Sequence, residues 1–459
     1  MINIIIKFYL LLSIKNDILS NILSVSVVAK KRTLKEINSK IEKGIVRIFT
    51  VQELIDKLEK GEKINFEDVD VITTATKALM SGIAGIFSFR LSPPKKVRKF
   101  VEVSINGIQG FPGPCPNEFL GIIDLILYGT AKSETREDYS GGMLFRDLVE
   151  GKEVNVKAKS VEGIQIEKTL TLKDFQFARL MGTRQAIRNY FAMVNPTEKD
   201  VETIFSVLAL KGNFSQLTFS GCGAMNPFQN DPNAEILGIG TKILVNGQIG
   251  YIMGPGTRND RLKPNLQTIS DMNGMDPEFM GSFKTSYGPE SICSIAVPIP
   301  ILNEGIWNNI VKSDHEVPLT VLNVVGRFKV GEITYGDVWH KNFVVKFYPD
   351  KCVDCDDCPV DGKCPTRAFD LKKGIDRSRC FNCGTCYYVC PEDAFDIDLK
   401  SVKVKLKGMT NEKTIPVVLR QSDRNGAIKL AERLKKMILQ GEFKLKEAMD
   451  PLEFYPKVF

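Results

Sequence analysis

Eight of the eleven cysteines in this 459-residue chain lie between Cys352 and Cys390, in two runs of similar spacing. The first run is Cys352, Cys355, Cys358 and Cys364, and the second is Cys380, Cys383, Cys386 and Cys390. In each run two residues separate the first three cysteines, so a tight loop points three sulfurs into one cavity. The fourth sulfur must come from outside that loop, an arrangement typical of a cluster with four iron positions.

The doubled pattern is the ligand pattern of a ferredoxin with two [4Fe-4S] clusters, in which each fourth cysteine precedes a proline and binds the other cluster. We therefore assign one cluster to Cys352, Cys355, Cys358 and Cys390, and the other to Cys380, Cys383, Cys386 and Cys364. The first run has a longer spacing before its last cysteine, and Asp361-Gly362 within it predicts a turn.

Zinc knuckles and disulfides are the alternatives for these eight thiols. Zinc takes its ligands in tetrahedral fours without the doubled three-plus-one arrangement, and disulfides are disfavoured in a reducing cytosol.

The length of the chain predicts two or three domains, and its composition, 43% hydrophobic and 25% charged, is that of a globular protein. The net charge of +7 is spread along the sequence. The basic clusters at Lys95 to Lys99 and Lys435-Lys436 have no interleaved aromatic residues, so we expect no nucleic-acid binding.

The N-terminal region is unusual, because Ile4 to Ile14 is apolar but stops at Lys15 and Asp17, well short of a membrane span. Charged residues also break the layout of a signal peptide. We interpret residues 1–32 as an extra segment ahead of a start near Thr33, and expect a cytoplasmic protein with no membrane association.

From Thr33 to about residue 340 the patterns predict a main domain of mixed α and β structure. Leu34, Ile37 and Ile41 predict a first helix, and Lys99 to Ile105 predicts a strand leading into an Asn106-Gly107 hairpin. Val69 to Thr74 reads as a short strand ending in a turn. The small residues of Ala75 to Phe89 favour tight helix packing, with close approach to a ligand as the alternative.

Three cysteines lie outside the two runs. Cys115 stands in a loop stiffened by three prolines, and Cys222 stands between Gly221 and Gly223, where amides could stabilise a thiolate. We predict that these two thiols are functional and that Cys293, within an apolar strand-like run, is a buried small hydrophobe. The chain has only two histidines, which favours sulfur relay or metal ligation over a Cys-His nucleophile.

A glycine-rich stretch follows Cys222 and predicts a β meander over Lys242 to Val245 and Gln248 to Met253. Its last loop, Gly254 to Arg258, could bind an anion through backbone amides and the Arg258 guanidinium. The loop lacks the Gly-x-Gly-x-x-Gly order of a dinucleotide site.

Several segments together resemble the homocysteine biosynthesis family of archaea and bacteria: Thr73 to Thr76, the Asn106-Gly107 loop, Val297 to Asn303 and the closing segment. Phe111 to Glu118 together with the cysteine runs is similar to its subgroup called methanogenesis marker 16 metalloprotein. The resemblance covers about Thr33 to Leu445. It implies sulfur transfer to aspartate semialdehyde with help from a ferredoxin-like partner, which is fused here. The family's cysteines in the segments corresponding to Ala75 to Gly85 and near Gly163 are missing from this chain.

The C-terminal part looks like the last piece of the family domain. Ser401 to Lys407 predicts an edge strand, and about Asp423 to Gln440 predicts a helix that Gly441 ends. We therefore predict an α+β, mixed α/β main domain (33–340) that is completed by residues 398–459. A small bacterial-type ferredoxin domain of βαββαβ-like fold (343–397) would be inserted between them.

The segment before this helix, Arg420 to Arg424, offers two arginines and Ser422 as ligands for a carboxylate or phosphate. The alternative is a capped helix start, with Ser422 or Asp423 as the N-cap.

These observations predict an enzyme of reductive sulfur transfer in which Cys222 first, and Cys115 second, carries sulfur to a small carbonyl acid. That acid would be bound by Arg258, Arg420, Ser422 and Arg424. A redox donor protein would supply electrons to the clusters. The alternative is an electron-transfer or maturation protein of methanogenic redox metabolism whose large domain docks a partner. The oligomeric state does not follow from the sequence.

Overall fold

The computed structural model describes residues 31–113 and 118–456, so the predictions for residues 1–30 and for Cys115 lie outside the described residues. The described part contains eight α-helices and two large sheets, which confirms an α+β architecture that is rich in strands. None of its helices is long and apolar enough to span a membrane.

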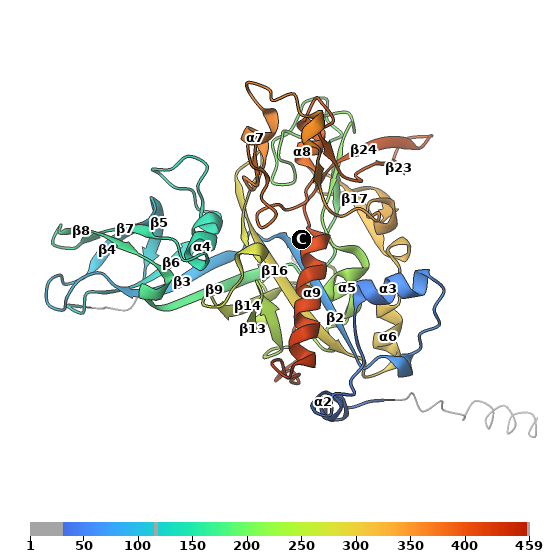
Figure 1. The fold of residues 1–459 in the computed structure, drawn as a ribbon, viewed down its shortest axis with the longest axis horizontal. Coiled ribbons are helices and arrows are strands. Elements are labelled where there is room, and N and C mark those ends of the chain that lie inside the picture. Colours follow the sequence, from blue (N-terminus) through green and yellow to red (C-terminus); the bar gives the residue numbers. More distant parts are fainter. Residues whose placement is uncertain (1–30, 114–117, 457–459) are drawn as a thin grey trace, which may run out of the picture.

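One long sheet runs through the body of the molecule and out into a wing (Figure 1). All its neighbouring strands are antiparallel except the parallel pair β1 and β2. In spatial order its strands are β1 (Ile48–Thr50), β2 (Val71–Leu79), β16 (Pro289–Pro300), β12 (Lys242–Val245), β13 (Gln248–Pro255), β14 (Leu266–Asp271), β9 (Phe175–Gln185), β3 (Ile83–Arg90), β6 (Ile122–Tyr128), β5 (Ile108–Pro112), β4 (Phe100–Ile105), β7 (Val154–Ser160) and β8 (Gln165–Leu170), with β15 (Gly281–Lys284) paired to β16.

The segment from Ala75 to Phe89 corrects one prediction, since it forms β2 and β3 and no helix. β2 also continues through the Thr73 to Thr76 segment, which therefore makes no turn. β-branched residues dominate this strand, and they favour extended backbone. The small residues allow layers of the structure to pack closely. For example, a Cβ at Gly85 would lie 2.7 Å from the ring of Phe145, which belongs to α4 (Gly141–Val149).

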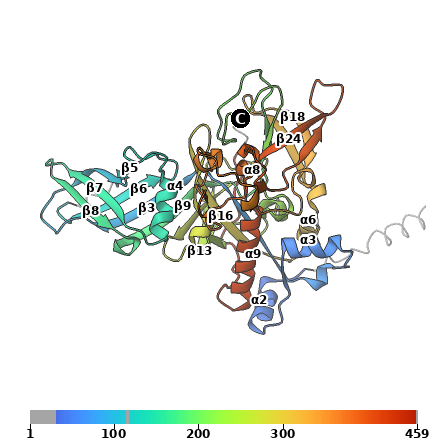
Figure 2. The same cartoon turned by 45° about the horizontal axis from the view of Figure 1, so that its top comes forward.

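A second sheet of six strands lies beside the body, where Figure 2 shows β18 and β24 together. Its spatial order is β18 (Lys329–Thr334), β17 (Pro318–Asn323), β10 (Ala192–Val194), β11 (Leu217–Phe219), β24 (Lys413–Arg420) and β23 (Ser401–Val404). The sheet curls, and its first and last strands come together. The Lys407 amide, just after β23, donates to the Val330 carbonyl of β18 at 2.7 Å. The two edges of this sheet therefore meet.

The helices cover the sheets on several sides. They are α2 (Leu34–Glu42), α3 (Val51–Glu59), α4 (Gly141–Val149), α5 (Pro227–Asn230), α6 (Glu304–Ile310), α7 (Pro359–Lys363), α8 (Thr385–Val389) and α9 (Arg424–Leu439). α9 lies across β2 and β16 and buries one apolar face, which includes Leu430 and Leu434. Asp423 is its N-cap and Gly441 follows it with positive φ, as expected for the start and stop.

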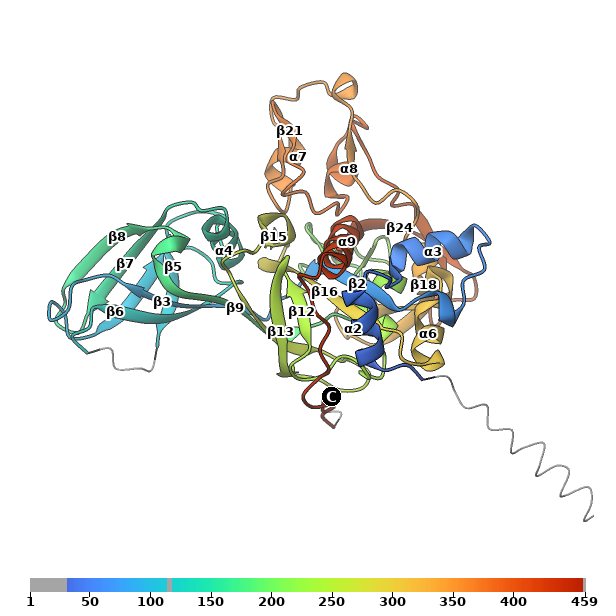
Figure 3. The same cartoon turned by 60° about the horizontal axis from the view of Figure 1, so that its bottom comes forward.

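Residues 346–396, which we call the cysteine lobe, stand off from the body in Figure 3. The lobe contains α7, α8 and two short antiparallel pairs. These pairs are β19 (Lys346–Phe347) with β22 (Phe395–Asp396), and β20 (Phe369–Asp370) with β21 (Gly374–Ile375). The chain enters the lobe after β18 and leaves it toward β23, so both of its ends are held by the six-stranded sheet.

Several local predictions are confirmed. Asn106-Gly107 joins β4 to β5 as a hairpin, β12 and β13 form the expected antiparallel pair, and β23 is an edge strand with Val402 and Val404 buried. Cys293 lies fully buried in β16, where burial raises the pKa of its thiol to about 12.

Candidate functional site

A cavity of about 520 Å³ lies between the long sheet and the six-stranded sheet. Its walls come from the C-terminal end of β2, the connection from β9 to β10, the turn after β11 and the loop before β14. A volume of this size falls within the range of sites for drug-sized ligands. The cavity is therefore the leading candidate for a substrate site among the described residues.

Basic side chains are the most distinctive feature of the cavity, which is lined by Arg184, Arg188, Arg258, Lys263 and Arg327. Of the predicted ligands, Arg258 and Ser422 line it. Within the described ranges no ion pair joins any of the five cations to a carboxylate. Unpaired cations converging on one cavity favour an anionic ligand.

The arginines of this group influence one another. Burial and then the nearby Arg258 guanidinium lower the pKa of Arg184. Burial also lowers the pKa of Arg188, whose guanidinium lies 4.6 Å from the Tyr190 ring centroid. Positive charges that oppose each other in this way are relieved when an anion binds between them.

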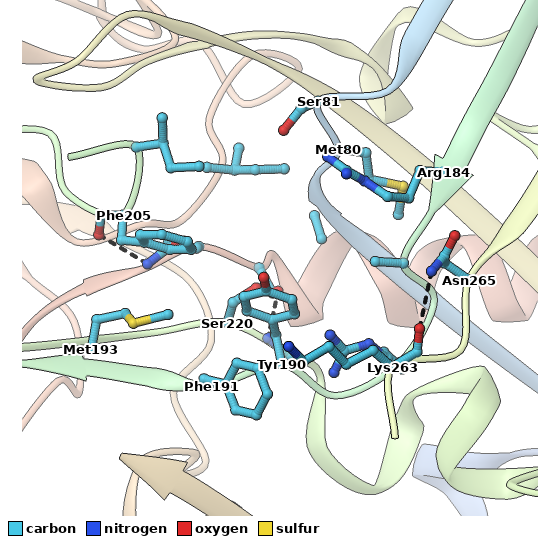
Figure 4. Close-up of a pocket in the computed structure, with 18 of the residues that line it drawn as sticks. Met80, Ser81, Arg184, Tyr190, Phe191, Met193, Phe205, Ser220, Lys263 and Asn265 are labelled. Atoms are coloured by element: carbon cyan, nitrogen blue, oxygen red, sulfur yellow. Dashed lines mark hydrogen bonds between the residues drawn. The ribbon is translucent and has the colours of Figure 1, made fainter. Parts of the chain in front are cut away.

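One side of the cavity is apolar. In Figure 4 Phe191, Met193 and Phe205 gather on one side, and Arg184, Lys263 and Asn265 lie on the other. Arg327 borders the apolar side, with its guanidinium 4.2 Å from the Phe205 ring centroid. The site thus combines a cationic end with an apolar wall.

Glu290 of β16 is a buried carboxyl group in the wall of this cavity and is only 7% exposed. Burial raises its pKa, while Ser81 and Arg184 partly oppose that shift. Its Oε2 atom has no hydrogen-bond partner among the described residues. Burial thus favours the protonated form of Glu290, and that form can donate a hydrogen bond or a proton to a ligand.

Cys222 lies directly behind the cavity wall and does not line it. Its Sγ lies 3.5 Å from Oγ1 of Thr76, which does line the cavity. Burial raises the pKa of the thiol against the opposing hydrogen bond from Thr76. The cysteine is therefore a buried thiol that is separated from the cavity by one layer of residues.

The turn in front of Cys222 is tightly fixed. Gly221 has φ +122°, and a Cβ there would lie 2.2 Å from the Tyr335 hydroxyl oxygen. The Gly221 amide donates to Oγ of Ser422 at 2.9 Å, and Trp339 donates through Nε1 to the Gly221 carbonyl at 3.0 Å. Glycine is required here, and the turn forms part of the cavity wall.

The two predicted arginine ligands at the start of α9 lie outside the cavity lining. Arg420 is fully buried and donates to the carbonyls of Asn342 and Asp398, and burial lowers its pKa to about 10. Arg424 pairs with Asp314 and donates to Gln52. Both guanidiniums are thus engaged by protein groups, which supports the capped helix start.

The sequence patterns missed Arg184, Arg188, Lys263, Arg327 and Glu290. These residues belong to no motif and reach one cavity from four segments of the chain. The available signal was the run from Arg184 to Arg188, which places two arginines between the end of an apolar strand and the aromatic pair Tyr190-Phe191.

The cysteine lobe brings its eight thiols together as two sets of four. The first set, Cys352, Cys355, Cys358 and Cys390, lines one small cavity. In the second set, Cys364, Cys380 and Cys383 all raise the pKa of Cys386, after the larger effect of burial. These sets have the same members as the two ligand sets predicted from the sequence.

Each set supplies the four thiols that the predicted cluster would require. The Ala368 amide donates to Sγ of Cys364 at 3.2 Å, a contact suited to a thiolate ligand. In the part of the chain that the structure describes, no three His, Cys, Asp or Glu side chains converge to hold a single metal ion. Four thiolates that bind four separate irons need no such convergence.

We call Cys352 to Cys358 the outer loop and Cys380 to Cys386 the inner loop, because only the inner one packs into the body. The Arg420 amide donates to the Cys383 carbonyl at 2.9 Å, and Asn382 donates to Oδ1 of Asp423 at 3.0 Å. The next residues after Arg420, Gln421 and Ser422, line the large cavity. One short strand end therefore touches both the inner loop and the cavity.

Asp423 also holds a buried ion pair at this contact. Its Oδ2 lies 2.9 Å from Nζ of Lys77, with side chains only 2% and 5% exposed. Thr76 lines the cavity, whereas the side chain of Lys77 lies on the opposite face of β2. The Asp423 amide also donates to the carbonyl of Lys77. The connection from β24 to α9 thus joins the two sheets and the lobe.

Comparison with known proteins gives a family and a set of methanogen relatives. The family described as homocysteine biosynthesis enzyme, sulfur-incorporation, matches residues 46–445. An uncharacterised protein of Methanothermobacter thermautotrophicus is 42% identical over 90% of this chain and 94% of its own length. Another from Methanocaldococcus jannaschii is 39% identical over 87% of this chain and 99% of its own.

A relative with a named activity matches a smaller part. The L-aspartate semialdehyde sulfurtransferase of Methanocaldococcus jannaschii is 30% identical over 63% of this chain and 58% of its own length. No solved structure matches the chain.

Proposed function

This chain belongs to the homocysteine biosynthesis enzyme, sulfur-incorporation family, and on that premise we propose that it is an iron-sulfur enzyme that transfers sulfur reductively to a small carbonyl acid. The sulfurtransferase relatives support the sulfur chemistry. The observation that carries the proposal is the shared strand end: Arg420 bonds to the inner loop, and Gln421 and Ser422 line the cavity. A redox group and a substrate site would thus lie on either side of one short segment.

The overall reaction requires two electrons when sulfide is the sulfur source. Addition of hydrogen sulfide to an aldehyde and loss of water leave a carbon-sulfur double bond. Two electrons and two protons then convert that bond to a thiol, which is homocysteine if the aldehyde is aspartate semialdehyde. Two bound [4Fe-4S] clusters would supply the two electrons, one each.

The residues of the cavity would bind and orient the acid. Arg184 and Arg258 would bind its carboxylate, and Ser422 would contribute a hydroxyl at the wall. Glu290, whose pKa is raised by burial, would give a proton to the oxygen that leaves as water. The apolar wall would limit the access of bulk water to the intermediate.

Cys222 is the proposed carrier of the sulfur, and Cys115 the second candidate. A donor persulfide would pass its outer sulfur to the Cys222 thiol and leave as a thiol. Two further electrons and two protons would then release that sulfur from Cys222 as hydrogen sulfide beside the cavity. Because Cys222 Sγ is buried behind Thr76 and the Gly221 turn, sulfur loading requires that turn to move. The hydrogen bonds of Gly221 to Ser422 and Trp339 are the contacts that must open. Loading would then occur in an opened state and transfer in the closed one.

The test is an anaerobic incubation of reconstituted protein with aspartate semialdehyde, a persulfide donor whose outer sulfur is isotopically labelled and a low-potential reductant, followed by mass spectrometry. Labelled homocysteine that requires both the reductant and Cys222 supports the proposal. The matched control is Cys293→Ser, because Cys293 is equally buried but lies in β16 and not beside the Gly221 turn of the cavity wall.

The competing function, an electron-transfer or maturation protein, makes a different prediction for the same variants. Cys222→Ser would then leave the rate of electron transfer to an acceptor unchanged, and no label would enter homocysteine in the wild type. That outcome, with both clusters intact and reducible, would overturn the sulfur-transfer proposal.

A further inference from the structure

The cavity carries more positive charge than a simple amino acid can neutralise. Its lining contains five basic side chains and only two carboxyl groups. One of the two carboxyls is Glu290, whose pKa is raised by burial. The other, Asp260, already accepts from the backbone amides of Leu262 and Lys263 at 2.8 Å. The cavity therefore has strong donors for anions and few acceptors for an ammonium group.

We infer that this cavity binds a small molecule with at least two anionic groups, a dicarboxylate or a phosphorylated acid. The inference rests on the proposed function only in taking the cavity as the substrate site. Aspartate semialdehyde has one carboxylate and one ammonium, so it would leave most of the cations unpaired. A second anionic group would pair with them and relieve the repulsion between Arg184 and Arg258.

The arrangement of the lining also indicates where the charges lie on the ligand. Arg184, Arg258 and Lys263 belong to the cationic end, whereas Arg327 lies at the apolar side against the Phe205 ring. A ligand with one anionic group at each of these two places would have an apolar chain between them, which would lie along Phe191 and Met193. The volume of about 520 Å³ leaves room for such a molecule.

Glu290 provides a second, independent observation. Its Oε2 has no partner among the described residues although the side chain is more than nine-tenths buried and lines the cavity. Burial favours the protonated form of this carboxyl, and that form can donate to a ligand carboxylate or carbonyl and so give Oε2 a partner. A ligand with several acceptor oxygens would complete the site.

The test is calorimetric titration of the anaerobic holoprotein with α,ω-dicarboxylic acids from succinate to suberate. Each acid is compared with its monoamide, which has the same length and one charge less. We expect at least one acid to bind about tenfold more tightly than its monoamide, the scale of one charge-assisted hydrogen bond. Phosphoglycolate against glycolate gives the corresponding comparison for a phosphate.

Variants locate the effect. Arg184→Gln and Arg258→Gln should each reduce the preference for the doubly charged ligand, whereas Arg261→Gln should retain it. Arg261 is the matched control, because it is exposed and close in sequence to Arg258 but does not line the cavity. If the wild type binds each doubly charged ligand and its singly charged counterpart with equal affinity, the inference is overturned, and no variant is needed to show it.

The outcome is independent of the sulfur-transfer assay. A preference for doubly charged ligands with no labelled homocysteine would support the inference and contradict aspartate semialdehyde as the substrate. Labelled homocysteine with no charge preference would support the proposed function and overturn this inference.

Discussion

The inner and outer loops of the cysteine lobe have the same cysteine spacing but opposite surroundings. In the inner loop Phe381 to Thr385 are all buried, whereas in the outer loop the residues between the cysteines are all exposed. Matched positions differ sharply: Phe381 is 1% exposed, and Val353, which also follows the first cysteine of its run, is 61% exposed. Two copies of one motif therefore occupy two different environments.

The difference assigns different tasks to the two loops. Asn382 and Asp354 share a left-handed backbone, with φ +51° and +54°, so the loops have similar local geometry there. Asn382 uses its side chain to bind Asp423 of the body, whereas Asp354 is one of three exposed aspartates of the outer loop. Under the proposed function, the inner loop would exchange electrons with the cavity, and the outer one would receive them from a donor protein.

The largest expected effect comes from the apolar contact of the inner loop. Phe381→Ala should lower the free energy of unfolding by about 3–5 kcal/mol, because it empties a site packed against the Phe283 ring. Val353→Ala is the matched outer change and should cost less than about 0.5 kcal/mol. Anaerobic guanidinium titration measures both, and equal costs would contradict the asymmetry.

The next effect is polar. Asn382→Ala should destabilise the protein by about 1–3 kcal/mol, since it removes a buried partner of the Asp423 carboxylate. Asp354→Ala at the matching outer position should change stability by less than about 0.5 kcal/mol. A similar loss from both variants in the same titration would show that the hydrogen bond to Asp423 is not what distinguishes the loops.

Iron removal sharpens the comparison through kinetics. With two clusters bound, a hydrophilic chelator should remove iron in two phases, the faster one from the set that includes half-buried Cys355, whose loop neighbours are exposed. The slower phase belongs to the set that includes buried Cys383. Absorbance and iron content followed over time would reveal the phases, and a single phase would count against different protection of the two sites.

The smallest effect concerns the helix after the inner loop. Tyr388→Phe should cost about 0.5–1.5 kcal/mol, because Gln216 loses the hydroxyl to which it donates. Tyr387→Phe is the control, since Tyr387 is exposed and no side-chain hydrogen bond joins it to the body within the described part of the chain. Thermal unfolding that shifts equally in both variants would show that the contact adds nothing to docking.

The spacing of the cysteines was enough to predict which four thiols gather together, because ligand spacing is local. It could not predict that one loop is buried, since Phe381 and Val353 are both apolar and their surroundings come from distant strands. In the same way Asp423 and Gly441 predicted the ends of α9, because capping depends on neighbours in the chain.

The predictions that depended on long-range packing fared differently. In the Ala75 to Phe89 segment, a Cβ at Gly85 would clash with the rings of Phe87 and Phe145. The local sequence cannot reveal the contact with Phe145, because that residue is distant in the chain. Arg420 and Arg424 looked like ligands because two arginines flank a polar loop, but Asp314 and distant carbonyls engage them. The cavity itself is built from segments far apart in sequence and has no motif.

The closure of the six-stranded sheet has a consequence for how this protein matures. The chain leaves the sheet at β18, builds the lobe and returns at β23, where the Lys407 amide bonds to Val330. β24, which supports the Gly221 turn through β11, follows the lobe in the chain. A lobe whose ends were far apart would keep this seam from closing. If the proposed clusters hold those ends together, their insertion would come before the cavity is completed.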